Sequence, residues 1–143
     1  MTETIIEGLR KFILKCPLLE DYSHAVGVDY LDKEAGFFSI EVTPCNTVEK
    51  TYLRGPMKKQ YQFSFVSRVL YGRETINQIE NLSFYERFER WLNDCNKKRV
   101  FPELPDGMQV QSIVPVSSGY IMAEEADKAR YQIQCKLTYF TKG

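Results

Sequence analysis

Two stretches of sustained alternation between apolar and polar residues, 60–71 and 129–140, constrain the fold of this chain most strongly. In the first, one face carries Tyr61, Phe63, Phe65, Val69 and Tyr71, and the other carries Gln60, Gln62, Ser64 and Arg68. In the second, Tyr131, Ile133, Cys135, Leu137 and Tyr139 alternate with Arg130, Gln132, Gln134, Lys136 and Thr138. A period of two places successive side chains on opposite faces of a strand. The pattern therefore predicts two long antiparallel strands, each with one buried face and one polar face.

Two other stretches have helical spacing. The first recurs over residues 5–13, where Thr2 or Thr4 can cap the start and Pro17 stops the helix. The second covers 75–98 and carries an aromatic stripe made of Phe84, Tyr85, Phe88, Trp91 and Leu92. Ser83 and Glu86 have the spacing of a capping box, so a break near Asn81 stays open. Both apolar stripes predict helices that pack against a core.

Shorter segments complete the sheet. Residues 26–31 and 37–42, joined by the polar turn 32–36, predict a hairpin. Residues 108–116 predict another strand, with Met108, Val110, Val114 and Val116 on its apolar face and Pro115 marking an edge or the end of pairing. Residues 43–58 are expected to form a long connection, and residues 117–127 an exposed loop.

This order of elements predicts a single α+β domain over residues 1–143. We expect an antiparallel sheet of about four or five strands, with the N-terminal and central helices packed on one face. A chain of 143 residues of which 13% are aromatic can bury a sizeable core.

Charge excludes some classes of partner. The chain carries 19 basic and 19 acidic residues, and the balance holds in each half, with nine of each sign in residues 1–71 and ten of each in 72–143. Neither half of the chain has an excess of basic residues that could bind phosphates, so we expect no specific nucleic-acid partner. No apolar run is long enough for a membrane span, and the N-terminus lacks a secretory signal, so a cytosolic protein without a membrane partner is expected.

Motifs that carry chemistry are few. The four cysteines, Cys16, Cys45, Cys95 and Cys135, are widely spaced and far from the single histidine, His24, so we expect free thiols and no metal site. Catalysis would need His24, alone or paired with Cys45, and nothing in the sequence supports that pair. Glu124, Glu125 and Asp127 lack the pattern of a calcium loop and are expected in a solvated turn. The sequence thus predicts no catalytic residue and no cofactor.

Two basic clusters have a simpler explanation than ligand binding. Lys58 and Lys59 follow a Gly-Pro turn, whereas Lys97, Lys98 and Arg99 end the second helix, where cations favour the helix dipole. Phosphate contact is a second interpretation of both clusters.

The polar face of the predicted sheet is unusual because it is rich in Gln, Ser and Thr and poor in charge. Such residues suit a surface that meets a neighbouring subunit or a wet lumen, but they are also simply tolerated in strands, and both interpretations stay open. Apolar residues at expected loops favour an assembly surface. The candidate subunit-interface residues are Tyr52, Leu53, Met57, Gln62, Tyr120, Ile121, Met122, Gln132 and Gln134.

The chain resembles small phage tail proteins of the tail-terminator or tail-completion type, including those called minor capsid or minor tail proteins in phages and prophages of Gram-positive bacteria. The likeness covers most of the chain and is carried by the order of elements. Its residues are Tyr61-Gln62-Phe63-Ser64-Phe65, the helix from Phe84 to Leu92, Leu104-Pro105, and the closing strand from Tyr131 to Phe140.

The resemblance implies a structural subunit rather than an enzyme. Such proteins form rings, often sixfold, that cap the tail tube and meet other tail or head-connector proteins. The location it implies is the bacterial cytoplasm during assembly and the virion tail afterwards. Two alternatives stay open: a head–tail joining protein that is monomeric until assembly, and a small cytosolic enzyme or ligand-binding domain that uses His24 or Cys45.

Overall fold

The structure, a computed structural model, describes residues 2–19, 26–29, 31, 37–45, 47–51, 55–70, 75–125 and 128–141. Its elements in chain order are α1 (Ile5–Ile13), β1 (Val26–Val28), β2 (Phe37–Thr43), β3 (Val48–Thr51), β4 (Met57–Leu70), α2 (Thr75–Lys98), β5 (Met108–Pro115), β6 (Tyr120–Glu125) and β7 (Lys128–Thr141). Within these ranges, seven strands form one sheet. The predicted α+β class is confirmed, because both helices pack on this mostly antiparallel sheet.

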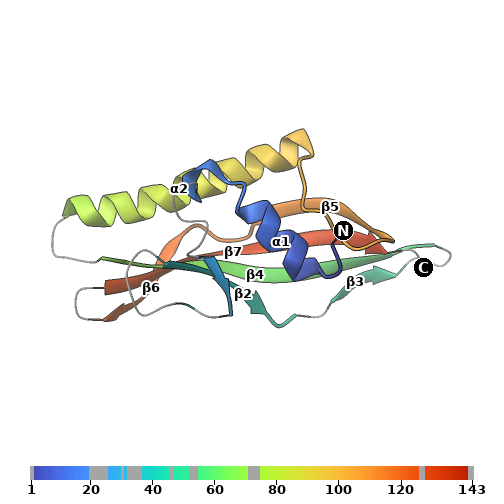
Figure 1. The fold of residues 1–143 in the computed structure, drawn as a ribbon, viewed down its shortest axis with the longest axis horizontal. Coiled ribbons are helices and arrows are strands. Elements are labelled where there is room, and N and C mark those ends of the chain that lie inside the picture. The colour runs from blue at the N-terminus through green and yellow to red at the C-terminus, as the bar shows by residue number, and fades with distance from the viewer. Residues whose placement is uncertain are drawn as a thin grey trace.

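The centre of the sheet is the antiparallel pair β4 and β7. Each strand has 14 residues, and they pair along their whole length, from Met57 opposite Thr141 to Leu70 opposite Lys128. Figure 1 shows the two strands side by side along the long axis of the molecule. These are the two alternating stretches of the sequence, and their long strands are confirmed.

Each central strand is flanked by two short strands placed end to end. β2 and β3 both pair with β4, whereas β5 and β6 both pair with β7. The expectations of a long connection over 43–58 and a loop over 117–127 are therefore wrong, because these ranges contain β3 and β6. A 14-residue central strand presents backbone groups along its full length, and short flanking strands pair with them even where the sequence alternates weakly.

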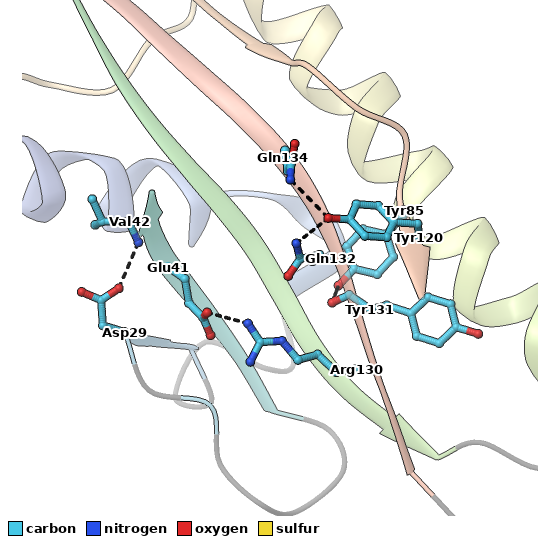
Figure 2. A network of polar contacts seen from close by, with 9 residues as sticks. All are labelled: Asp29, Glu41, Val42, Tyr85, Tyr120, Arg130, Tyr131, Gln132 and Gln134. Atoms are coloured by element: carbon cyan, nitrogen blue, oxygen red, sulfur yellow. Dashed lines mark hydrogen bonds and ion pairs between the residues drawn. The ribbon is translucent and has the colours of Figure 1, made fainter. Parts of the chain in front are cut away.

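The predicted hairpin of residues 26–42 is also wrong, because β1 pairs with β2 in parallel, with Val26 opposite Phe38. Asp29, directly after β1, has a left-handed backbone with φ of 51°. Its N–H donates to the Ile40 carbonyl, and its carboxylate accepts from the Val42 N–H at 2.9 Å (Figure 2). Asp29 thus ties the end of β1 to β2. The proposed turn, 32–36, lies outside the described residues.

Both helices contribute to the core on one sheet face. Thr4 caps α1 by accepting from the Glu7 N–H, so Thr4 is the cap among the two candidates. α2 continues through Ser83, which shows that the capping-box interpretation is wrong. The fully buried side chains from the two helices and the sheet include Leu9, Ile13, Phe63, Phe65, Tyr85, Phe88, Leu92, Ile113, Ile133 and Leu137.

A bulge changes which residues of β5 reach the core. The register between β5 and β7 shifts between Val110 and Ser112, so Ile113 is fully buried while Val116 is exposed. The predicted apolar face therefore holds only for its first half. Pro115 ends this edge strand, as expected.

The buried Tyr85 hydroxyl connects α2 to both central strands. It donates to the Tyr131 carbonyl at 3.0 Å (Figure 2). The Ser67 hydroxyl, 2.6 Å away, is therefore the donor to Tyr85. Burial raises the pKa of Tyr85 well above its ordinary value, which keeps the phenol neutral. Gly119 packs directly against Tyr85. A Cβ at position 119 would lie 2.2 Å from the Tyr85 Cβ, so a larger residue would clash there.

We expect Tyr85→Phe to lower the free energy of unfolding by about 1–3 kcal/mol, because two buried polar groups lose a partner. Urea denaturation measures the loss. Ser67→Ala should lower the free energy of unfolding less in the Tyr85→Phe background than in the wild type. In that background the Ser67 hydroxyl has already lost its Tyr85 partner, so its removal breaks no further hydrogen bond between the two. Fully additive costs would show that the two hydroxyls do not interact.

Candidate functional site

The candidate site is the polar face, meaning the sheet face opposite the helices. Its side chains come from alternate positions of the strands: Ser39, Glu41, Gln60, Gln62, Ser64, Val66, Arg68, Arg130, Gln132, Gln134, Lys136 and Thr138. Some of them are buried, including Ser39, Ser64, Gln132 and Thr138. Part of this face is thus packed within the subunit, whereas Gln134 is exposed.

Tyr120 organises the part of this face beside β7. The Gln132 side-chain amide donates to the Tyr120 hydroxyl oxygen at 2.6 Å, and the Gln134 amide donates to it at 3.2 Å (Figure 2). A phenol oxygen has two acceptor lone pairs and one proton. Because the two amides occupy the lone pairs, the Tyr120 proton is left to donate, and no described residue accepts it. The Tyr120 hydroxyl therefore has an oriented proton without an acceptor among the described residues.

The interface candidates differ in exposure. Gln132 is only 6% exposed and bonds inside the subunit, so it supports Tyr120 rather than meeting a partner directly. Gln134 is exposed, whereas Met57, Gln62 and Tyr120 are half-buried. Tyr52 and Leu53 lie outside the described residues.

The edge strand β6 presents the most exposed candidates. Ile121 is 37% and Met122 56% exposed, and a register irregularity between Ile121 and Ala123 accompanies them. Two apolar residues of α2, Ile79 and Leu82, are also exposed. Figure 1 places β6 and the N-terminal part of α2 at the same end of the molecule. Four of the nine exposed large apolar side chains among the described residues thus lie on these two elements. Such side chains can mark a protein–protein contact surface where they are contiguous.

Sequence reasoning missed an ion pair across the polar face. Arg130 on β7 reaches over β4 to Glu41 on β2, with Nη2 and Oε1 2.5 Å apart (Figure 2). Between them in the sheet, Val66 is fully buried although it belongs to the polar face. No short-range pattern could have found this pair, because its members are 89 residues apart.

Of the two residues proposed for catalysis, the structure describes only Cys45. His24 lies outside the described residues. Cys45 is half-buried, and its thiol is 4.0 Å from the Gln60 carbonyl oxygen, to which it donates. The other three cysteines are buried and free, and burial raises the pKa of Cys16 to about 11 and that of Cys135 further.

Thiol labelling should separate these cysteines. In the native protein at pH 8, we expect Cys45 to react with a disulfide reagent much faster than Cys16, Cys95 and Cys135, because those three are buried and thiolates are the reactive species. Mass spectrometry of the labelled peptides identifies the order of reaction. Equal rates for all four thiols in folded protein would contradict the described packing.

The basic clusters lie on different elements. Lys97 and Lys98 belong to the last turn of α2, and Lys98 pairs with Asp94 at 3.0 Å, as the helix-dipole interpretation suggests. Lys58 lies near the start of β4, and ten residues of strand separate it from Arg68 by about 33 Å. Lys58 and Arg68 therefore lie near opposite ends of β4.

Among the described residues, no group of three or more His, Cys, Asp or Glu side chains is placed to hold a metal ion. None of the described helices is both long enough and apolar enough to cross a bilayer. Glu124 and Glu125 belong to β6 and not to the expected turn, and Asp127 lies outside the described residues. No protein-family model and no curated protein sequence matches the chain.

Proposed function

We propose that the protein is a structural subunit of a phage or prophage tail, of the tail-terminator or tail-completion type. It acts through contacts with further copies of itself, which form a closed ring that caps the tail tube, and with other tail or head-connector proteins. The proposed function requires no catalytic residue.

The observation that carries the proposal is the combination of Tyr120 with the exposed side chains of β6. Tyr120 offers a donor fixed by two amides, and Ile121 and Met122 offer apolar area beside it. Interfaces typically combine an apolar centre with directed hydrogen bonds and few charges. A zero net charge also removes long-range repulsion between copies.

A joining protein that stays monomeric until assembly is the second candidate. It is favoured by the internal packing of the polar face, where Ser39, Gln132 and Thr138 are already buried without a neighbour. Such a face needs no second copy for its stability. If the protein is a joining protein, the exposed side chains of β6 contact a different tail or connector protein.

Particle analysis tests both versions of the function. Phage-like particles should be purified after induction of a cell that carries the gene, and the protein should be quantified by mass spectrometry and located by immunogold labelling. We expect a few copies per particle, located at the junction of head and tail. Particles that are complete and infectious without the protein would overturn the proposal.

A further inference from the structure

A groove lies on the helix side of the sheet, between residues 17–18 and the C-terminal half of α2. Its volume is about 600 Å³. Pro17 and Leu18 form one part of its lining, and side chains of α2 form the rest. The α2 residues of this lining include Arg87, Arg90, Trp91, Asp94 and Lys97. We call this surface the α2 groove, and it is separate from the polar face of the sheet.

The charge of the α2 groove is mainly positive. Arg87, Arg90 and Lys97 are exposed, and steps of three and seven residues place them on one side of the helix. The helix dipole accounts for Lys97 in the last turn, but Arg87 and Arg90 lie in the middle of α2, beyond the reach of that effect. Asp94, the one acidic residue in the described lining, pairs with Lys98 at 3.0 Å. The α2 groove therefore favours an acidic partner.

Trp91 gives the α2 groove an apolar wall of fixed orientation. Its ring centroid lies 5.1 Å from that of Phe12 on α1 and 5.7 Å from that of Phe88, so packing on both helices holds the half-buried ring in place. Pro17 and Leu18 add further apolar lining. This setting suits an apolar side chain of a partner, because interface anchors typically fill pockets with rigid apolar walls.

The chain carries a complementary segment on β6. Ile121 and Met122 are exposed apolar residues, and the exposed Glu124 follows within the same strand. Glu124 is opposite Ala129 of β7, so its cross-strand neighbour carries no charge. Residues 121–125 include two acidic residues and no basic one. β6 therefore offers the combination of apolar and acidic groups that the α2 groove favours.

We infer that the α2 groove of one subunit binds β6 of a second copy of this chain. In this contact Met122 packs against Trp91, and the Glu124 carboxylate pairs with Arg87 or Arg90. Because the two surfaces differ, the contact is heterologous, and each copy uses its groove for one neighbour and its β6 for the other. Such contacts close into a ring when the rotation between neighbours permits it. The inference rests on the proposed function, since it requires self-assembly.

Charge reversal in the α2 groove tests this contact. We expect Arg87→Glu/Arg90→Glu to weaken self-association at least tenfold in sedimentation velocity. Its melting temperature should stay within a few degrees of that of the wild type, because both side chains are exposed. Lys11→Glu/Lys15→Glu is the matched control, since it makes the same change in net charge at exposed residues outside the groove. Equal weakening by both variants would show a general effect of charge and would overturn the inference.

A milder variant decides the test if charge reversal disturbs the helix. Arg87→Gln/Arg90→Gln adds no carboxylate beside Glu86 and Glu89, and we expect it to weaken self-association at least threefold. Self-association of this variant at wild-type strength would overturn the inference.

A mixture of two defective variants identifies the partner surfaces. Arg87→Glu/Arg90→Glu retains an intact β6, whereas Ile121→Asp/Met122→Asp retains an intact α2 groove. Each variant alone should stay monomeric where the wild type assembles. At high concentration, which offsets the missing ring closure, the equimolar mixture should form a heterodimer that grows no further, because one intact contact is left. A mixture that stays monomeric at high concentration would overturn the inference.

The wild type separates this inference from the proposed function. If the wild type assembles and Arg87→Glu/Arg90→Glu assembles equally well, the α2 groove contact is overturned while the ring stands. If the wild type stays monomeric at every concentration, the ring and this contact are overturned together.

Discussion

Replacing Phe88 with alanine is expected to lower the free energy of unfolding by about 3–5 kcal/mol, the usual cost of deleting a buried aromatic side chain. Phe88 is fully buried between α2 and the sheet. Its ring stacks on that of Phe65 in β4, with ring centroids 4.7 Å apart, and the ring centroids of Phe88 and Trp91 are 5.7 Å apart. Removing the ring leaves a cavity where α2 meets β4. Because the neighbouring side chains belong to a helix and a strand, they can move only a little to fill this cavity.

Urea denaturation followed by the fluorescence of Trp91, the single tryptophan, measures this loss. The matched control is Glu86→Ala, on the exposed side of the same helix, which should change stability by less than about 0.5 kcal/mol. A loss below about 1 kcal/mol for Phe88→Ala would contradict the packing of α2 on the sheet.

The second large effect concerns assembly. We expect the double variant Ile121→Asp/Met122→Asp to weaken self-association at least tenfold, because two charges would be placed in an apolar contact and lose their water. Since both side chains are exposed in the subunit, its melting temperature should stay within a few degrees of that of the wild type. Light scattering across a concentration series and a thermal melt give the two readouts.

Val100→Asp provides the control for this prediction. Val100 is also exposed, at 51%, but it follows the C-terminal end of α2, away from β6. Equal weakening by Val100→Asp and by the β6 variant would mean that β6 is not the contact. A collapse of the melting temperature in the β6 variant would instead show that its side chains belong to the folded core.

The long strands could be predicted because their alternation extends over many residues. In β7, the five predicted apolar positions from Tyr131 to Tyr139 are all buried. A slip of one residue would move all of them out of the hydrophobic core to the polar face, so the register is strongly specified. The aromatic stripe of α2 was predictable for a similar reason, since Phe88 and Leu92 recur at helical spacing and both are fully buried.

The short strands could not be predicted in the same way. β1 and β3 have three and four residues, too few for a period to be distinguished from chance. The parallel pairing of β1 with β2 is accompanied by contacts from Asp29 to residues 11 and 13 positions away, which a local pattern does not show. In β5, the shift after Val110 moves Ile113 into the core, and an alternation pattern cannot anticipate a bulge.

The candidate site was predictable only in outline. The sequence indicated a neutral polar face and named Tyr120, Gln132 and Gln134, and the structure connects these three side chains in one network. The sequence did not indicate that Gln132 is buried, or that Tyr120 and Met122 lie on a strand. The Arg130–Glu41 pair and the α2 groove arise from packing that brings together residues that are distant in sequence.

Sedimentation velocity of the wild-type protein over a wide concentration range tests the central claim most directly. A subunit of 16.7 kDa that forms a closed ring should convert with rising concentration into one discrete larger species, without a continuous series of intermediates. The account predicts this discrete species, and its loss in Ile121→Asp/Met122→Asp. A wild-type protein that stays monomeric at every concentration would contradict assembly of this subunit with itself.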